Sequence, residues 1–282
     1  MVRVGVHVSV AGGLDRAVTR AKAKECDLFQ IFSRNPRGWR LKPLSQDEAK
    51  RFVAKFNQSG LDLAVDHMPY LPNLASPKED VYAKSVEALA TELMRCKMLG
   101  IPYLVTHLGS HLGEGRERGQ KRIASALETA FSCAESDVIL LLENTAGTKN
   151  SMGGSFQDIA AIIESTGTRC LGVCLDTCHL FAAGYELRTA EGLETTLDQF
   201  EKSLGLQMLK LLHLNDCRGT FGSHLDRHEH IGLGQIGEQG FRNILAHPAL
   251  KDLPMILETP VDLRRDDSGN LRMARQLASG IK

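Results

Sequence analysis

Short apolar runs alternate with amphipathic stretches along the whole chain. Most of these runs are rich in valine, isoleucine and leucine on both faces, which is typical of parallel strands buried on both sides. The pattern therefore predicts eight buried strands, at Val2–Ser9, Leu28–Phe32, Leu61–His67, Pro102–His107, Val138–Glu143, Cys170–Asp176, Leu209–Leu214 and Met255–Glu258.

The stretches between the runs carry helix start and stop signals. A serine followed three residues later by an acidic residue is typical of a helix N-terminus, and a glycine is typical of its end. These signals predict helices with N-caps at Ser45, Ser76 and Ser155 that end near Gly60, Gly100 and Gly167. Eight strands alternating with helices favour an α/β fold, a single (β/α)₈ TIM barrel spanning 1–282 as one catalytic domain. An open doubly wound sheet is the alternative, but no strand is followed by the glycine fingerprint of its dinucleotide-binding form.

Composition constrains the partners and the cellular location that we expect for this protein. The 34 lysines and arginines balance 34 aspartates and glutamates, so net charge alone does not indicate a nucleic-acid partner. Seven cysteines, an odd number, without a secretory or transit segment predict free thiols and an intracellular, cytoplasmic protein. No apolar run is long enough to span a bilayer, so no membrane association is expected. No exposed apolar stripe is evident, which favours a monomer.

Six of the eight apolar runs end, or nearly end, in a residue of a metal-ligating type. The carboxyl ends of barrel strands open onto one face, where active sites lie, so these six side chains are expected to converge. They are His67, His107, Glu143, Asp176, His213 and Glu258.

Three more residues of the same kind follow these strands. His179 lies three positions after Asp176, while Asp226 and His228 lie in the loop after the seventh run. A single histidine or glutamate at a strand end is usually structural, but four carboxylates gathered in one place would repel one another unless cations compensate. We therefore interpret all nine residues as metal ligands.

The donor set consists of nitrogen and oxygen, which suits zinc or manganese better than calcium. Zinc usually takes four ligands, so nine residues suit three ions per chain if one carboxylate bridges, and Glu143 on a middle strand is the natural bridge. Mn²⁺ remains possible at some positions. Cys178 could also be a ligand, but its side chain is expected to point away from its neighbours. Several closely spaced metals indicate phosphoester hydrolysis, since one ion activates water while others hold the attacking and leaving oxygens.

At this point the chain resembles endonuclease IV, the zinc-dependent apurinic/apyrimidinic endonuclease family of base excision repair. The matching segments are ordered along nearly the whole chain: Gly5–Ser9 with Ala11–Gly13, Asn35–Trp39, His67–Leu74, Thr106–Ser110, Leu142–Gly147, Gly172–His179, His213–Asp216, Asp226–Gly232 and Glu258–Pro260.

The resemblance implies how the nine ligands are shared among three Zn²⁺. His67 and His107 would hold the first zinc, the set Asp176, His213 and Glu258 the second with Glu143 bridging these two, and the set His179, Asp226 and His228 the third. It also implies the reaction: a hydroxide between the first two zincs would attack the phosphorus 5′ to an abasic site in duplex DNA. The third zinc would stabilise the leaving 3′-oxygen, and the products would be a 3′-hydroxyl and a 5′-deoxyribose phosphate.

The family also uses loop residues as wedges that fill the gap left by an extruded nucleotide. Here these DNA-binding residues would be Arg37, Tyr70 and Leu71. The chain departs from the family pattern at Leu108, at Cys217-Arg218 and in the loop 148–151. None of these departures removes a ligand, but Arg218 is not equivalent to the usual lysine at a phosphate contact.

Two other functions fit part of this pattern. A metal-dependent sugar isomerase could use two divalent ions on the same scaffold, and it would need neither the third donor set nor the wedge residues. A non-enzymatic zinc-stabilised DNA-binding module is the second, but structural zinc sites are closed and usually rich in cysteine.

Overall fold

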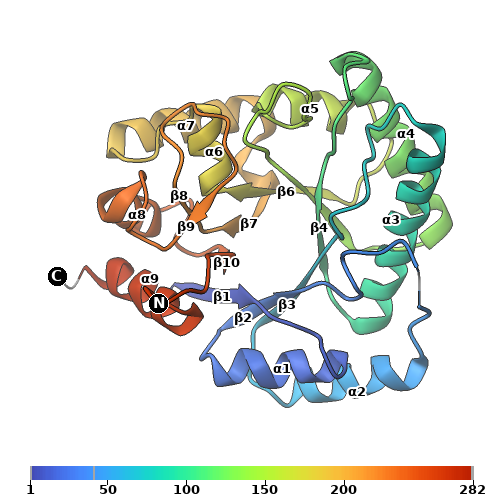
Figure 1. The fold of residues 1–282 in the computed structure, drawn as a ribbon, viewed down its shortest axis with the longest axis horizontal. Helices are drawn as coiled ribbons and strands as arrows, with labels where there is room; N and C mark the ends of the chain where they lie inside the picture. The colour runs from blue at the N-terminus through green and yellow to red at the C-terminus, as the bar shows by residue number, and fades with distance from the viewer. Residues whose placement is uncertain (1, 41, 281–282) are drawn as a thin grey trace.

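The computed structural model describes residues 2–40 and 42–280, and eight parallel strands close into a barrel (Figure 1). The neighbours around the barrel follow the order β1-β2-β3-β4-β5-β6-β7-β10, with β10 pairing back onto β1. The strands are β1 Arg3–His7, β2 Leu28–Ile31, β3 Leu63–His67, β4 Tyr103–His107, β5 Ile139–Glu143, β6 Leu171–Asp176, β7 Leu209–His213 and β10 Pro254–Leu257. All eight predicted strands and the predicted TIM barrel are confirmed, with only the strand ends displaced.

Helices surround the barrel and cover the outer faces of its strands (Figure 1). Within the described residues they are α1 Leu14–Ala23, α2 Gln46–Asn57, α3 Glu79–Leu99, α4 Arg116–Ala134, α5 Phe156–Glu164, α6 Thr177–Ala183, α7 Ala190–Leu204, the short 3₁₀ turn η1 Leu206–Met208, α8 Gly237–Ala246 and α9 Asp267–Ser279. None of them is long and apolar enough to cross a membrane.

The predicted caps are confirmed at three helix ends and wrong at one. Ser45 and Ser155 each accept a hydrogen bond from the backbone N–H three residues later, and Gly100 ends α3 in the left-handed conformation. The prediction for Ser76 is wrong, because α3 begins at Glu79. The Ser76 hydroxyl instead accepts from the N–H of Lys78 at 3.2 Å in a local turn, which competes with helix formation.

The barrel interior contains a ring of apolar side chains, one from every strand except β1. Its members are fully or almost fully buried: Leu28, Val65, Val105, Leu141, Cys174, Leu211 and Ile256. In β1 the corresponding place is taken by Gly5, where any Cβ would overlap the carbonyl oxygen of Leu28. This apolar ring fills the barrel interior at its own level. The next inward-facing side chains, two residues further along each strand, therefore pack on top of it.

A separate two-stranded ribbon lies outside the barrel, in the connection between β7 and α8. It pairs β8 Asp216–Cys217 with β9 His228–Glu229 in antiparallel register. The single domain over 1–282 stays a prediction, and Met1 and residues 281–282 lie outside the described residues.

Candidate metal centre

Polar side chains form a second ring at the carboxyl end of the barrel, two residues beyond the apolar ring on each strand. Six of its members are the predicted strand-end ligands, and these converge as expected. The other two, on β1 and β2, are new. In chain order the ring is His7, Gln30, His67, His107, Glu143, Asp176, His213 and Glu258.

Glu143 is completely buried, and its carboxylate faces four imidazoles of the site. Its Oε2 is 3.2 Å from His67 Nε2 and 3.5 Å from His107 Nε2. Its Oε1 is 2.9 Å from His213 Nδ1 and 3.6 Å from His179 Nδ1. One carboxylate therefore touches imidazoles from both sides of the ring, as a bridging ligand must.

Of the five overlapping groups of metal-capable donor atoms in the described residues, three coincide with the three predicted ligand sets. They are His67, His107 and Glu143; then Glu143, Asp176, His213 and Glu258; then His179, Asp226 and His228. In each, one ligand atom per residue lies within 4.8 Å of all the others. The Nε2 of His228 is buried without any hydrogen-bond partner, which costs free energy unless another group occupies that lone pair. The residues present therefore fit divalent cations.

The third cluster depends on the loop between β7 and α8. Asp226 Oδ1 lies 3.2 Å from His179 Nε2 and 3.5 Å from His228 Nε2. A buried carboxylate, Asp216, organises this loop by accepting hydrogen bonds at 2.8–3.3 Å from five backbone N–H groups, those of Cys217, Gly232, Gly234, Ile236 and Gly237. The loop that carries two of the donors is thus held by the protein itself.

Two asparagines, which the strand-end pattern did not reveal, position Asp176. Asn144 Oδ1 accepts from the backbone N–H of Asp176 at 2.7 Å. Asn215 Nδ2 donates to Asp176 Oδ2 at 2.6 Å. The other carboxylate oxygen caps α6 by accepting from the N–H of His179 at 2.7 Å. Asn144 directly follows Glu143, and Asn215 lies two residues after His213. Asparagine is too common in loops for this position alone to predict a role in the site.

Backbone carbonyls fix the ring orientation of three of the histidines. His67 Nδ1 lies 2.7 Å from Met68 O, His179 Nδ1 lies 2.9 Å from Asn144 O, and His228 Nδ1 lies 3.1 Å from Glu258 O. Because a carbonyl only accepts, Nδ1 carries a proton in each of these rings, and Nε2 faces the centre and bears the lone pair whenever the ring is neutral.

The expectation for Cys178 is wrong in one respect. Its sulfur lies close to donor atoms of Asp176 and His228, because residue 178 belongs to helix α6 and does not follow strand alternation. A hydrogen bond with Cys217, together with burial, raises the pKa of the Cys178 thiol. Metal ligation by Cys178 would require the loss of that proton.

The electrostatics of the centre reflect four carboxylates facing five imidazoles. Burial alone would raise the pKa of Glu143, but His107 and His213 outweigh burial and hold that pKa well below its usual range. Burial would likewise lower the pKa of His179, but Asp176, Asp226 and Glu143 raise it to about 10. The pKa of His213 is also raised, because Cys174, Glu258 and Glu143 together outweigh burial. Without metal, protons supply the positive charge that the carboxylates require.

We expect zinc binding to release protons from this centre. The raised pKa values of His179, at about 10, and of His213 favour the protonated rings, and each ring must lose a proton before its nitrogen can bind metal. Zinc affinity should therefore rise with pH from 6 to 8. Calorimetric titration of metal-free protein in buffers of different ionisation enthalpy measures the protons released. His247→Gln, at a remote histidine paired with Glu194, should not change that number. A binding enthalpy that is the same in all buffers would contradict the expectation.

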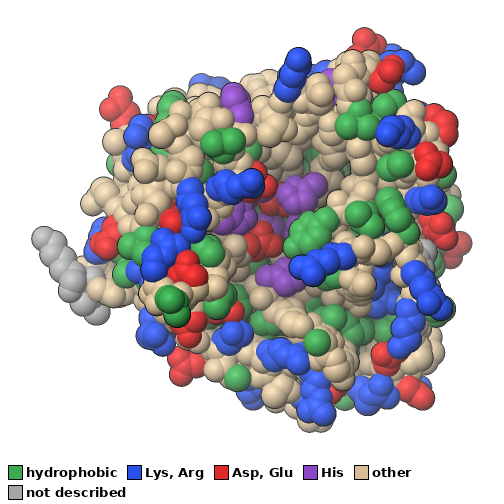
Figure 2. Space-filling view, in the orientation of Figure 1, with side chains coloured by type: hydrophobic (Ala, Val, Ile, Leu, Met, Phe, Trp, Pro, Cys, Tyr) green, Lys and Arg blue, Asp and Glu red, His purple; other side chains and the backbone are tan. Residues whose placement is uncertain are grey.

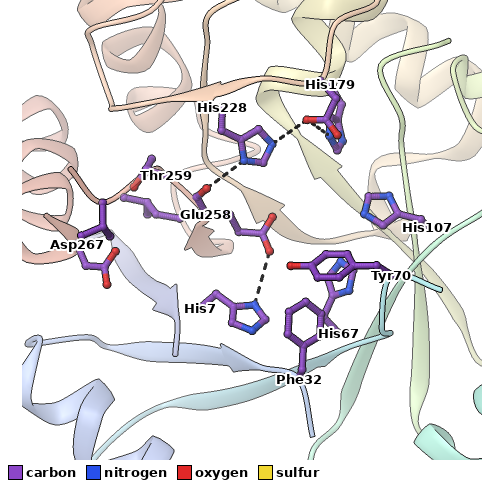
Figure 3. A pocket seen from close by; sticks show the side chains of 13 residues that line it. His7, Phe32, His67, Tyr70, His107, His179, His228, Glu258, Thr259 and Asp267 are labelled. Carbon is purple, nitrogen blue, oxygen red and sulfur yellow. Dashed lines mark hydrogen bonds and ion pairs between the residues drawn. The ribbon is translucent and has the colours of Figure 1, made fainter. Parts of the chain in front are cut away.

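A cavity of about 380 Å³ opens above the donor clusters. Figure 2 shows histidine and acidic side chains on the floor of this hollow, with lysines and arginines around its rim. Figure 3 shows Tyr70 and Phe32 as one wall, opposite His228 and Thr259. The ring centroids of Tyr70 and Phe32 are 4.9 Å apart. The metal-capable centre is thus open to a ligand of moderate size from one face.

The predicted DNA-binding residues lie on the loops after β2 and β3. Tyr70 lines the cavity with 64% of its surface exposed, and Leu71 is 38% exposed beside it. Arg37 is exposed on the loop after β2, close enough that its charge acts on the Tyr70 hydroxyl. All three side chains are available to a ligand approaching this face.

The departures from the family pattern leave the centre intact. Leu108 is fully buried. Arg218 is half exposed, and its Nε donates to Glu229 Oε2 at 3.0 Å. The charge of Arg218 is therefore partly neutralised within the protein.

Fold and site together define a class of protein. The family model of the xylose isomerase-like TIM barrel matches residues 18–278, so the chain belongs to that family. Within this class the chain is 58% identical to "Probable endonuclease 4" of Methanoculleus marisnigri, with 99% of each protein covered. It is 49% identical to "Probable endonuclease 4" of Nitrosopumilus maritimus, covering 98% of this chain and 100% of the relative.

A solved structure agrees with these relatives. Endonuclease IV from Thermus thermophilus superposes with a TM-score of 0.88 at 39% identity, with 99% of both chains covered. The chain belongs to the endonuclease IV family. A D-tagatose 3-epimerase-like protein also superposes, with a TM-score of 0.70 over 98% of each chain, but at 18% identity it shows only the shared fold.

Proposed function

We propose that this protein is an endonuclease that cleaves duplex DNA on the 5′ side of abasic sites in base excision repair, with three zinc ions as cofactors. The observation that carries the proposal is the coincidence of three donor clusters with the three ligand sets expected for the family. The products are a 3′-hydroxyl and a 5′-deoxyribose phosphate.

Nine side chains would hold the metals, in the three clusters described above. When bound, such ions lower the pKa of water and offset the charge that develops on phosphoryl oxygens. Glu143 would be the shared ligand of two positions, because its two oxygens face different histidines. The carbonyls bonded to His67, His179 and His228 would hold these rings with Nε2 directed at the metals.

The cavity wall provides selectivity for damaged DNA. Extruding a nucleotide costs unstacking energy, and a missing base lowers that cost. Tyr70 and Leu71 present exposed apolar surface at the rim, while Arg37 adds a cation beside them. These side chains would fill the gap in the duplex, and Phe32 beneath Tyr70 supports that ring.

Tyr70→Ala is expected to weaken binding to abasic duplex about tenfold while leaving the zinc content unchanged. The ring contributes stacking surface to the DNA, about 1–3 kcal/mol per base by analogy with aromatic platforms, but no atom to the donor clusters. Fluorescence anisotropy with a labelled duplex and metal analysis of the same preparation measure the two effects. Met94→Ala, an exposed apolar residue on α3, is the matched control. Loss of zinc without loss of DNA affinity would contradict the wedge role.

Cleavage of a defined duplex tests the proposal directly. A 5′-labelled strand with one abasic site should be cut once by zinc-loaded protein, and the fragment should be extended by a DNA polymerase because its end is a 3′-hydroxyl. The same duplex with an intact base serves as the control. Zinc-loaded protein that leaves the abasic strand uncut would overturn the proposal. Binding of two ions instead of three would favour a sugar isomerase.

A further inference from the structure

Two members of the polar ring, Gln30 and His7, belong to none of the donor clusters in the described part of the chain. Gln30 is completely buried at the end of β2, and His7 ends β1 beside it. A buried side-chain amide destabilises a protein unless its hydrogen-bonding groups have partners. Its partners therefore indicate what it does.

The amide of Gln30 has three partners, and together they fix its orientation. Its Nε2 lies 2.7 Å from Glu258 Oε1 and 3.1 Å from His7 Nδ1, while its Oε1 lies 2.9 Å from His213 Nε2. An ionised carboxylate only accepts, so the NH₂ group must face Glu258. A flipped amide would place two acceptor oxygens against each other. The carbonyl oxygen therefore faces His213.

This orientation determines which nitrogen of His213 can bind metal. Because Gln30 Oε1 only accepts, His213 Nε2 must carry a proton. In the neutral ring that metal binding requires, the lone pair therefore lies on Nδ1, which is 2.9 Å from Glu143 Oε1 and 3.3 Å from Glu258 Oε2. His213 thus directs Nδ1 at the donor cluster, whereas His67, His179 and His228 direct Nε2. The partner that orients His213 is the Gln30 side chain, whereas backbone carbonyls orient the other three rings.

We infer that Gln30 is a positioning residue for the second metal position, and that His7 holds its amide in place. One amide both selects the tautomer of His213 and fixes the Glu258 carboxylate, so the two donors face the same point. Figure 3 shows His7 directed at Glu258, on the same side of the cavity. The inference rests on the proposed metal centre, but its test does not depend on DNA cleavage.

The test is zinc titration of metal-free protein against a chromogenic chelator. Gln30→Leu keeps the side-chain volume and removes all three hydrogen bonds. Partners that orient a ligand typically contribute about 10–100-fold to metal affinity, so one of the three ions should bind 10–100-fold more weakly and the other two should be unaffected. The control is Thr196→Val on the distant helix α7, which removes a part-buried hydrogen bond to Glu186 O and should leave all three affinities unchanged.

Two further variants separate positioning from a general effect on folding. Gln30→Asn retains a polar amide but is one methylene too short to reach both partners, so it should reproduce the loss even if Gln30→Leu does not fold. In a His213→Ala background, Gln30→Leu should weaken zinc binding much less than it does alone, because the two residues act together.

Specific outcomes would overturn the inference. Three unchanged affinities in both Gln30 variants would do so, as would equal weakening at all three positions. If the unaltered protein fails to cleave abasic DNA while Gln30→Leu still loses one ion selectively, the proposed substrate is wrong and the positioning role stands.

Discussion

Glu143→Gln should reduce incision of abasic duplex by more than about a hundredfold while the barrel stays folded. The amide has nearly the same shape but carries no charge, and it cannot offer two equivalent oxygens to the imidazoles on either side. The fold should survive because β5 pairs with β4 and β6 through its backbone. Single-turnover kinetics on labelled duplex and circular dichroism of the same sample measure the two properties.

Glu164→Gln provides the matched control for this substitution. It makes the same chemical change at an exposed position at the end of α5 and should leave the rate unchanged. Retained turnover in Glu143→Gln would exclude the bridging role. Loss of the circular dichroism signal would instead indicate that the buried charge is needed for folding.

Asp226→Ala should reduce the bound zinc from three ions to two and slow incision about a hundredfold, the usual effect of removing one stabiliser of transition-state charge. Asp226 supplies one of three donors in the third cluster, and its side chain is 56% exposed, so its removal leaves no cavity in the core. Metal analysis after dialysis and single-turnover kinetics measure both effects.

Asp252→Ala, an exposed aspartate in the turn that precedes β10, is the control for Asp226→Ala. It should retain three ions and the full rate. If Asp226→Ala retained three tightly bound ions, the third cluster would not be a metal position. Two ions with an unchanged rate would show that the third ion is dispensable for cleavage.

The strand-end pattern alone predicted the barrel and the convergence of six donors. This was possible because the apolar runs are continuous and because all parallel strands of a barrel end on one face. His67, Glu143 and His213 could therefore be placed together without any coordinates. Their division into clusters needed the family resemblance, since spacing along the chain does not determine which strands face each other across the centre.

His7 and Gln30 were missed for a physical reason. Glutamine is not a metal-ligand type, and His7 lies inside its apolar run, two residues before the predicted end at Ser9. Only the pairing of β1 with β2 shows that both residues belong to the polar ring. His7 lies two residues beyond Gly5, and Gln30 lies two residues beyond Leu28, both at the level of the apolar ring. The Ser76 prediction failed differently, because a serine hydroxyl serves a turn as readily as a helix start.

The loop tied by Asp216 has a consequence for how this site can vary. It leaves the barrel after β7, carries Asp226 and His228, and returns before α8, with its backbone fastened to one carboxylate. Asp226 and His228 therefore belong to one self-contained segment. The other donors lie at the ends of the barrel strands or, for His179, on helix α6. Trimming this segment should therefore remove one cation, and transplanting it onto a related barrel that has a histidine at the position of His179 should add one, with no change to the barrel strands.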